Sequence, residues 1–253
     1  MAEIVQSVDR SLCILEVLSD YEDGLGITEI AEKVDLHKST VYRLLNTLVW
    51  KGYIKQNKNT SKYGLTLKLF ELGNKKVEKM DFVTIAQPYL KELMEKTNEV
   101  VHLVVREENE IMYLAKVEPQ KSMKMYTRIG MRKPMYCTAM GKAMMSQMSE
   151  EEVEEIWNGS DIKKLTENTI VDIEKLKESL SEIRKKGYAV DDQEVEIGIR
   201  CIGTVVKDHK NNVSGAISLS SSIITFTEDK IEYFSKMILE CANKISKELG
   251  YRG

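Results

Sequence analysis

The sequence lacks any apolar run of the roughly 18 residues needed to cross a bilayer. Its first residues also lack the basic and then apolar segments of a secretory signal. Four cysteines are widely separated, without a Cys-x-x-Cys pair, and there are three histidines. This pattern argues against a disulfide framework and against a zinc site. We therefore expect a cytoplasmic globular protein with no membrane contact, no metal and no cofactor.

Acidic residues are missing from one long stretch. The residues from Leu36 to Phe70 contain no Asp or Glu, although the chain has 40 acidic and 37 basic residues. An even distribution would place about five acids there. The stretch nevertheless contains seven basic residues, Lys38, Arg43, Lys51, Lys55, Lys58, Lys62 and Lys68. This basic island, in a chain of net charge −3, favours local contact with a polyanion.

Apolar residues recur every three to four positions in the first 51 residues, which predicts three amphipathic helices. The second spans 27–34. The third runs from about Lys38 to Lys51 and stops at Gly52, a residue suited to the left-handed position after a helix. The first ends near Asp20, and its apolar series is Ile4, Val8, Leu12, Leu15 and Leu18.

Two alternating segments, 53–56 and 63–67, flank the turn-rich residues 57–62 and predict a β-hairpin. Three helices followed by a two-stranded wing form a winged helix-turn-helix, whose third helix enters the major groove of DNA. Double-stranded operator DNA is therefore the expected partner. The predicted DNA-binding residues are Lys38, Ser39, Thr40, Tyr42, Arg43, Lys55, Lys58 and Lys62.

These polar residues could instead form an ordinary solvated helix face, but the acid-free surroundings favour DNA contact. Lys38 and Ser39 are predicted to contact the DNA backbone at the amino end of the helix. Arg43 is predicted to reach a base edge or a phosphate. The wing lysines are predicted to add affinity through counterion release without reading sequence.

The remaining chain alternates strand and helix patterns, which predicts an α/β sandwich with a mainly antiparallel sheet. Predicted strands are 100–106, 111–117, 188–190, 198–206 and 213–220. Predicted helices are 83–97, 139–147, 150–157, 173–186 and 228–249. We expect an α+β protein with a winged helix-turn-helix domain over 1–66, a connecting helix over 67–80 and a larger domain over 81–253.

Several segments, in order, resemble the IclR family of bacterial transcription regulators. They are 5–10, 30–31, 38–48, 52–54, 63–66, 136–143, 187–194 and 198–203. The resemblance implies a homodimer or homotetramer with a GAF-like C-terminal domain that binds a small organic acid. The implied effector-binding residues are Ala139, Met140, Asp191, Cys201, Ser218 and Ser220.

The chain departs from the family pattern at two positions near this predicted site. Tyr136 stands where a histidine is usual, and Met140 replaces a leucine before Gly141 and Lys142. Among family members, the chain is most similar to repressors of pectin and hexuronate breakdown, which respond to 2-keto-3-deoxygluconate.

The effector residues can also be interpreted without the family. Asp191 and Asp192 are adjacent on a predicted strand, so their side chains point to opposite faces and cannot act as a catalytic pair. Ser218 and Ser220 share a strand face and offer convergent hydroxyls suited to a carboxylate. Cys201 is either a nucleophile or a small buried hydrophobe.

These observations predict a ligand-responsive transcription regulator, a repressor of a carbohydrate or organic-acid operon, that is not an enzyme. Three alternatives remain: an enzyme using Cys201 or Asp191, a C-terminal domain that only oligomerises, and an activator of the same family. His102 lies in an apolar run, where a hydrogen-bonded structural histidine is expected in preference to a metal ligand.

Overall fold

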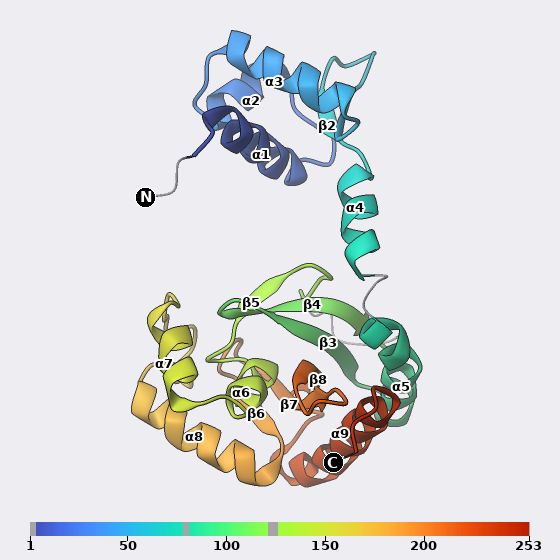
Figure 1. Ribbon diagram of the computed structural model, residues 1–253, viewed down its shortest axis with the longest axis vertical. Coiled ribbons are helices and arrows are strands. Elements are labelled where there is room, and N and C mark those ends of the chain that lie inside the picture. Colours follow the sequence, from blue (N-terminus) through green and yellow to red (C-terminus); the bar gives the residue numbers. More distant parts are fainter. Residues whose placement is uncertain (1–3, 78–80, 121–125, 253) are drawn as a thin grey trace. The chain divides into compact units, whose positions relative to one another are not determined.

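The computed structural model describes residues 4–77, 81–120 and 126–252, and these form two compact units (Figure 1). The first unit is Met1–Lys79 and the second is Met80–Gly253. The finer division into 1–66, 67–80 and 81–253 stays a prediction. No helix of the described residues is long and apolar enough to span a membrane.

The first unit contains three helices, a hairpin and a fourth helix, as the sequence predicts. Its elements are α1 (Gln6–Ser19), α2 (Ile27–Lys33), α3 (Lys38–Trp50), β1 (Ile54–Gln56), β2 (Tyr63–Leu65) and α4 (Lys68–Val77). The two strands pair antiparallel, with Ile54 opposite Leu65. Gly52 follows α3 with a φ of +77°, the left-handed conformation that its position predicts.

One apolar cluster joins the three helices and the hairpin. Ile14, Ile30, Leu45 and Ile54 come from four different elements and are buried together. Burial of apolar side chains from every element is what holds these short helices in place, because isolated helices of this length are marginal in water.

The apolar series predicted for α1 is only partly buried. Leu15 and Leu18 lie in the cluster, whereas Ile4, Val8 and Leu12 are exposed in the single chain. The buried stripe of α1 instead includes Ile14. Val8 and Leu12 are therefore available for contacts outside this chain.

A six-stranded sheet forms the centre of the second unit, in the order β5-β4-β3-β8-β7-β6. All its neighbouring strands pair antiparallel, which confirms the predicted sheet type. The strands are β3 (Val100–Glu107), β4 (Glu110–Val117), β5 (Arg132–Pro134), β6 (Ala189–Asp192), β7 (Ile199–Lys207) and β8 (Val213–Ser222).

Helices cover this curled sheet (Figure 1). They are α5 (Asp81–Thr97), α6 (Ala139–Met145), α7 (Glu150–Asn158), α8 (Ile173–Lys186), the 3₁₀ turn η1 (Glu228–Lys230) and α9 (Ile231–Glu248). Helices α5 and α9 pack together and contact the sheet, while α6 contacts β6, β7 and β8 and has α8 outside it. All seven residues of α6 are buried as a result.

The differences from the predicted elements are small. Strand β5 was not predicted, because Arg132, Lys133 and Pro134 show no apolar alternation. The helix predicted over 139–147 ends at Met145. The strand predicted over 188–190 is β6, which extends to Asp192. The α+β fold class is confirmed.

Candidate effector pocket and DNA-binding surface

The face of α3 opposite its buried stripe carries polar side chains together with Trp50, which is 77% exposed. Val41, Leu45 and Leu48 point into the core. The predicted DNA-binding residues on the other side differ in exposure: Lys38, Ser39, Tyr42 and Arg43 are exposed and Thr40 is half-buried. Tyr42 is 53% exposed, so packing in the core does not explain a tyrosine at this position.

The amino end of α3 is not covered by a capping side chain among the described residues. His37 occupies the cap position, and its side chain makes no cap hydrogen bond. The amide groups of Thr40 and Val41 bond to the His37 carbonyl. Since the first amides of a helix have no intrahelical partner, those of Lys38 and Ser39 can donate to a phosphate.

The hairpin is tied by backbone hydrogen bonds to the loop between α1 and α2. Leu25 and Tyr63 exchange two of them, at 2.9 and 2.7 Å. A β-carbon on Gly24 would lie 2.3 Å from the Tyr63 carbonyl oxygen, so only glycine permits this approach. Lys55 and Lys58 of the hairpin are exposed, and Lys62 is half-buried.

The second unit contains a cavity of about 90 Å³ beside the amino end of α6. This is room for a molecule several times the size of water. Its lining comes from all six strands of the sheet, from the amino end of α6 and from the loops after β4 and β6. The lining residues are His102, Tyr113, Tyr126, Thr127, Met131, Lys133, Thr138, Ala139, Met140, Asp191, Val195, Glu196, Ile199, Cys201 and Ser220.

Five of the six effector residues implied by the resemblance line this cavity: Ala139, Met140, Asp191, Cys201 and Ser220. Ser218 is buried outside the lining, with its hydroxyl 3.5 Å from Ser220 Oγ and 3.4 Å from His102 Nδ1. It therefore supports the wall. The binding roles of all six residues stay predictions.

His102 joins three parts of the cavity wall. Its Nε2 lies 2.8 Å from Thr127 Oγ1, and its Nδ1 lies 3.5 Å from Ser220 Oγ. Its ring meets that of Tyr113 edge to face, with centroids 5.1 Å apart. Burial lowers the pKa of His102 to about 3, so the ring is neutral. A hydrogen-bonded structural role was predicted, whereas its position in the cavity wall was not.

Asp191 and Cys201 face each other on paired strands. Burial raises the pKa of the Asp191 carboxyl to about 7, and the nearby Lys142 ammonium opposes the rise. Burial also raises the pKa of the Cys201 thiol well above its ordinary value. A thiol that keeps its proton is a weak nucleophile, which counts against covalent chemistry at this site.

Asp192 points to the opposite side of β6, as the strand geometry predicts. Its carboxylate accepts two hydrogen bonds from the Arg200 guanidinium, both at 3.0 Å. The two adjacent carboxyls therefore have separate surroundings, and they do not form a pair.

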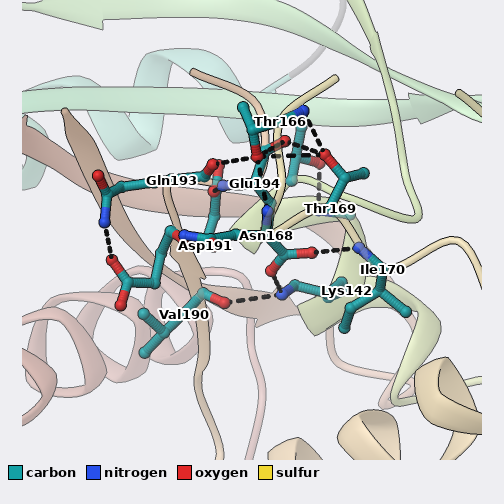
Figure 2. A network of polar contacts seen from close by, with 12 residues as sticks. Lys142, Thr166, Asn168, Thr169, Ile170, Val190, Asp191, Gln193 and Glu194 are labelled. Atoms are coloured by element: carbon teal, nitrogen blue, oxygen red, sulfur yellow. Dashed lines mark hydrogen bonds and ion pairs between the residues drawn. The ribbon is translucent and has the colours of Figure 1, made fainter. Parts of the chain in front are cut away.

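A buried polar network adjoins the cavity (Figure 2). The Lys142 ammonium forms an ion pair with Glu194 and donates to the Val190 carbonyl oxygen at 2.7 Å. The Glu194 amide donates to Asp191 Oδ1 at 2.8 Å. The network thus joins α6 to the pocket-lining strand β6 and to the loop that follows it.

The segment before α8 also forms hydrogen bonds to the loop that follows β6. The Thr166 hydroxyl donates to the Gln193 carbonyl at 2.6 Å, and the Thr169 hydroxyl donates to the Glu194 carbonyl at 2.6 Å (Figure 2). Among the described residues, no group of three or more His, Cys, Asp or Glu side chains could hold a metal ion.

Both units match one family of known proteins. Residues 7–58 match the IclR helix-turn-helix domain. Residues 74–247 match the C-terminal domain of the bacterial transcriptional regulator IclR. The chain belongs to the IclR family.

The relatives extend over the full length of the chain. The HTH-type transcriptional regulator KdgR of Escherichia coli (strain K12) is 38% identical over 247 residues, covering 98% of this chain and 94% of that protein. The crystal structure of IclR from Thermotoga maritima is similar with a TM-score of 0.85 and 35% identity, covering 97% and 99% of the two chains.

A third similar structure is an IclR homologue of Microbacterium hydrocarbonoxydans complexed with 4-hydroxybenzoate. Its TM-score is 0.84, at 20% identity and coverage of 96% of this chain and 99% of that one, so it supports the fold alone. The family membership makes this protein a DNA-binding transcription regulator and not an enzyme.

Proposed function

We propose that this IclR-family regulator is a repressor of a carbohydrate or organic-acid catabolic operon, and that a small carboxylate releases it from its operator. The observation that carries the proposal is the cavity in the second unit, which combines apolar walls with a few convergent polar groups. Such a combination is typical of a small-molecule site.

The polar groups of the cavity suit a hydroxylated or keto acid. Lys133 contributes an ammonium, and Thr127 and Ser220 contribute hydroxyls. The IclR homologue with 4-hydroxybenzoate carries a carboxylate ligand, and the sequence resembles repressors that respond to 2-keto-3-deoxygluconate. A keto or sugar acid is therefore the proposed effector, bound in the domain over 81–253 by Ala139, Met140, Asp191, Cys201 and Ser220, with Ser218 supporting Ser220 and His102 from outside the lining.

Operator DNA is proposed to bind the winged domain over 1–66. Lys38 and Ser39 would contact phosphates at the uncapped end of α3, where backbone amides also favour an anion. Arg43, exposed one turn later, would contact a base edge or a phosphate. Thr40 and Tyr42 complete the proposed α3 surface, and Lys55, Lys58 and Lys62 add wing contacts to the DNA backbone.

The protein is proposed to act as a homodimer or homotetramer on a partly palindromic operator, because two recognition helices must match successive major grooves. Exposed apolar residues support subunit contact. Val8 and Leu12 on α1 are exposed, as are Leu69, Phe70 and Leu72 on α4. Soluble single chains rarely leave such residues grouped in the open.

Ligand release would be a population shift. The acid can weaken operator binding only if it binds more tightly to the arrangement in which the recognition helices no longer fit the DNA. The proposed connecting helix over 67–80 would transmit the change between the two domains.

The test begins with duplexes selected from a random library by the full-length protein. Fluorescence anisotropy then gives the Kd for a selected duplex with and without 2-keto-3-deoxygluconate, pyruvate or glyoxylate at fixed salt. The proposal expects one acid to raise the Kd at least tenfold, which is about 1.4 kcal/mol. An acid that lowers the Kd would favour the activator alternative. A Kd that none of these acids changes would favour a C-terminal domain that only oligomerises.

A further inference from the structure

One buried ammonium group and two buried carboxyl groups lie close together beside the cavity. Lys142 is 2% exposed, Glu194 5% and Asp191 4%. The Lys142 ammonium donates to the Glu194 carboxylate and to the Val190 carbonyl oxygen. Asp191 accepts from the Glu194 amide and lines the cavity. One ammonium thus serves two buried carboxyl groups, and its ion pair is with Glu194.

Other titratable or charged groups lie around Asp191 on every neighbouring element. They are His102 on β3, Tyr113 on β4, Tyr126 after β4, Lys133 on β5, Cys137 before α6, Lys142 on α6, Cys201 on β7, and Glu194 and Glu196 after β6.

Most of these groups keep one protonation state near neutral pH. Burial raises the pKa of Cys137 to about 12 and raises those of Tyr113 and Cys201 further, so all three keep their protons. His102 stays neutral because burial lowers its pKa to about 3. Glu194 has a raised pKa from burial, but the Lys142 ammonium is bonded directly to it. Asp191 instead accepts from the Glu194 amide, and its pKa of about 7 allows it to gain or lose a proton near neutral pH.

A carboxylate ligand would bring another negative charge to this place. Two carboxylates that share a site with little water cannot both remain ionised, and one of them takes a proton. The cavity wall offers Asp191 for this purpose. A protonated Asp191 changes from an acceptor into an O–H donor, which can bond to the ligand's carboxylate oxygen.

We propose that the pocket binds a small carboxylate together with one proton, which Asp191 holds and donates as a hydrogen bond to the ligand. This inference rests on the proposed function, since it requires an acid in this cavity. The proton comes from solvent when Asp191 is ionised in the free protein. An uncharged carboxamide would bind without this proton uptake, so the uptake is a property of a ligand carboxylate.

The linkage has a definite direction. Where Asp191 is already protonated, binding takes up no proton and affinity does not change with pH. Above that range each complex takes up one proton, so the affinity falls tenfold for every pH unit.

Calorimetry on the full-length protein measures the proton directly. 2-Keto-3-deoxygluconate is titrated at pH 8.5 in HEPPS and in Tris, and at pH 5.5 in MES and in piperazine, because the two buffers of each pair differ in ionisation enthalpy. The expected result is uptake of nearly one proton per site at pH 8.5 and nearly none at pH 5.5. Binding without uptake at pH 8.5 would overturn the inference while leaving the proposed function intact. If neither this acid nor pyruvate nor glyoxylate binds at either pH, the proposed function fails and the inference fails with it.

Two variants assign the proton to its residue. Asp191→Asn should bind without proton uptake and with an affinity that does not change with pH. Asp192→Asn makes the same chemical change one residue along β6, on the face turned away from the cavity, and should retain the uptake. Uptake that persists in Asp191→Asn would overturn the assignment. If this variant does not fold, the wild-type titrations still decide whether a proton is taken up.

Discussion

Gly203 on β7 and Met140 on α6 are in close backbone contact. A β-carbon on Gly203 would lie 2.8 Å from the Met140 nitrogen and 2.9 Å from the Ala139 carbonyl carbon. Both are main-chain atoms and cannot turn away as a flexible side chain can. Since Met140 and Ala139 line the cavity, the absence of a side chain at Gly203 sets how closely the cavity wall approaches the sheet.

Gly203→Ala is therefore expected to push α6 away from β7. The expected cost is about 1–3 kcal/mol of unfolding free energy, as for other overpacked sites, together with weaker effector binding. Gly73→Ala is the matched control, because nothing lies within 4 Å of its added β-carbon and alanine favours a helix by about 0.5–1 kcal/mol over glycine. Chemical denaturation measures both. Equal effects of the two changes would contradict the role assigned to the close contact.

Lys142→Met is expected to be among the most destabilising single changes in the second unit. It would leave Glu194 and Asp191 buried without a cation, and loss of one partner of a buried pair costs about 3–5 kcal/mol. Denaturation at pH 7 measures the cost, which should shrink at pH 5 as the carboxyls take up protons.

Two comparisons test this explanation. Lys142→Met/Glu194→Met removes both charges of the pair and should be less destabilised than Lys142→Met alone. Lys236→Met removes an ammonium from an exposed pair with Glu232 and should change stability by less than about 0.5 kcal/mol. A double variant as unstable as the sum of its single variants would show that the charge imbalance is not the cause.

The stability of Asp191→Asn relative to wild type should depend on pH. The folded protein holds the Asp191 proton up to about pH 7, whereas the unfolded chain loses it near pH 4. The contribution of Asp191 to the free energy of unfolding of wild type is therefore lost as pH rises from about 4 to 7. Asparagine has no proton to lose, so the variant does not show this decrease. We expect the variant to gain about 2–3 kcal/mol on wild type between pH 5 and pH 8. A difference in unfolding free energy that is constant over this range would contradict the buried carboxyl as its source.

Periodicity in the sequence predicted most of the fold, because the long helices have one apolar face. The helix over Ile173–Lys186 was predicted with its exact bounds, helped by the left-handed Gly187 that ends it. The prediction was incomplete where contacts with other segments determine whether a residue is paired or buried. The strand Arg132–Pro134 forms only by pairing with β4, and Val8 and Leu12 fit the helical period yet remain exposed.

The candidate site was predicted less fully than the fold, because a cavity wall is assembled from distant segments. The family resemblance named Asp191 and Cys201, which do line the cavity. It did not name Thr127, whose hydroxyl reaches His102 across 25 positions of sequence. The Lys142–Glu194 ion pair joins residues 52 positions apart. Only their three-dimensional proximity reveals such pairs, since neither residue type is distinctive on its own.

The DNA-binding surface gives a prediction that separates two kinds of contact. Arg43→Ala should cost about 1–3 kcal/mol on the selected duplex and little on a scrambled one, if its guanidinium reads a base edge. Lys58→Ala, in the hairpin turn, should weaken binding to both duplexes alike. It should also lower the slope of log affinity against log salt by about 0.9, the value for one phosphate contact. Lys236→Ala, in the second unit, is the control and should leave both Kd and slope unchanged. Anisotropy titrations at four salt concentrations measure all three variants. An unchanged Kd for Arg43→Ala on the selected duplex would remove α3 from the proposed recognition surface, and a loss shared equally by both duplexes would make Arg43 a phosphate contact.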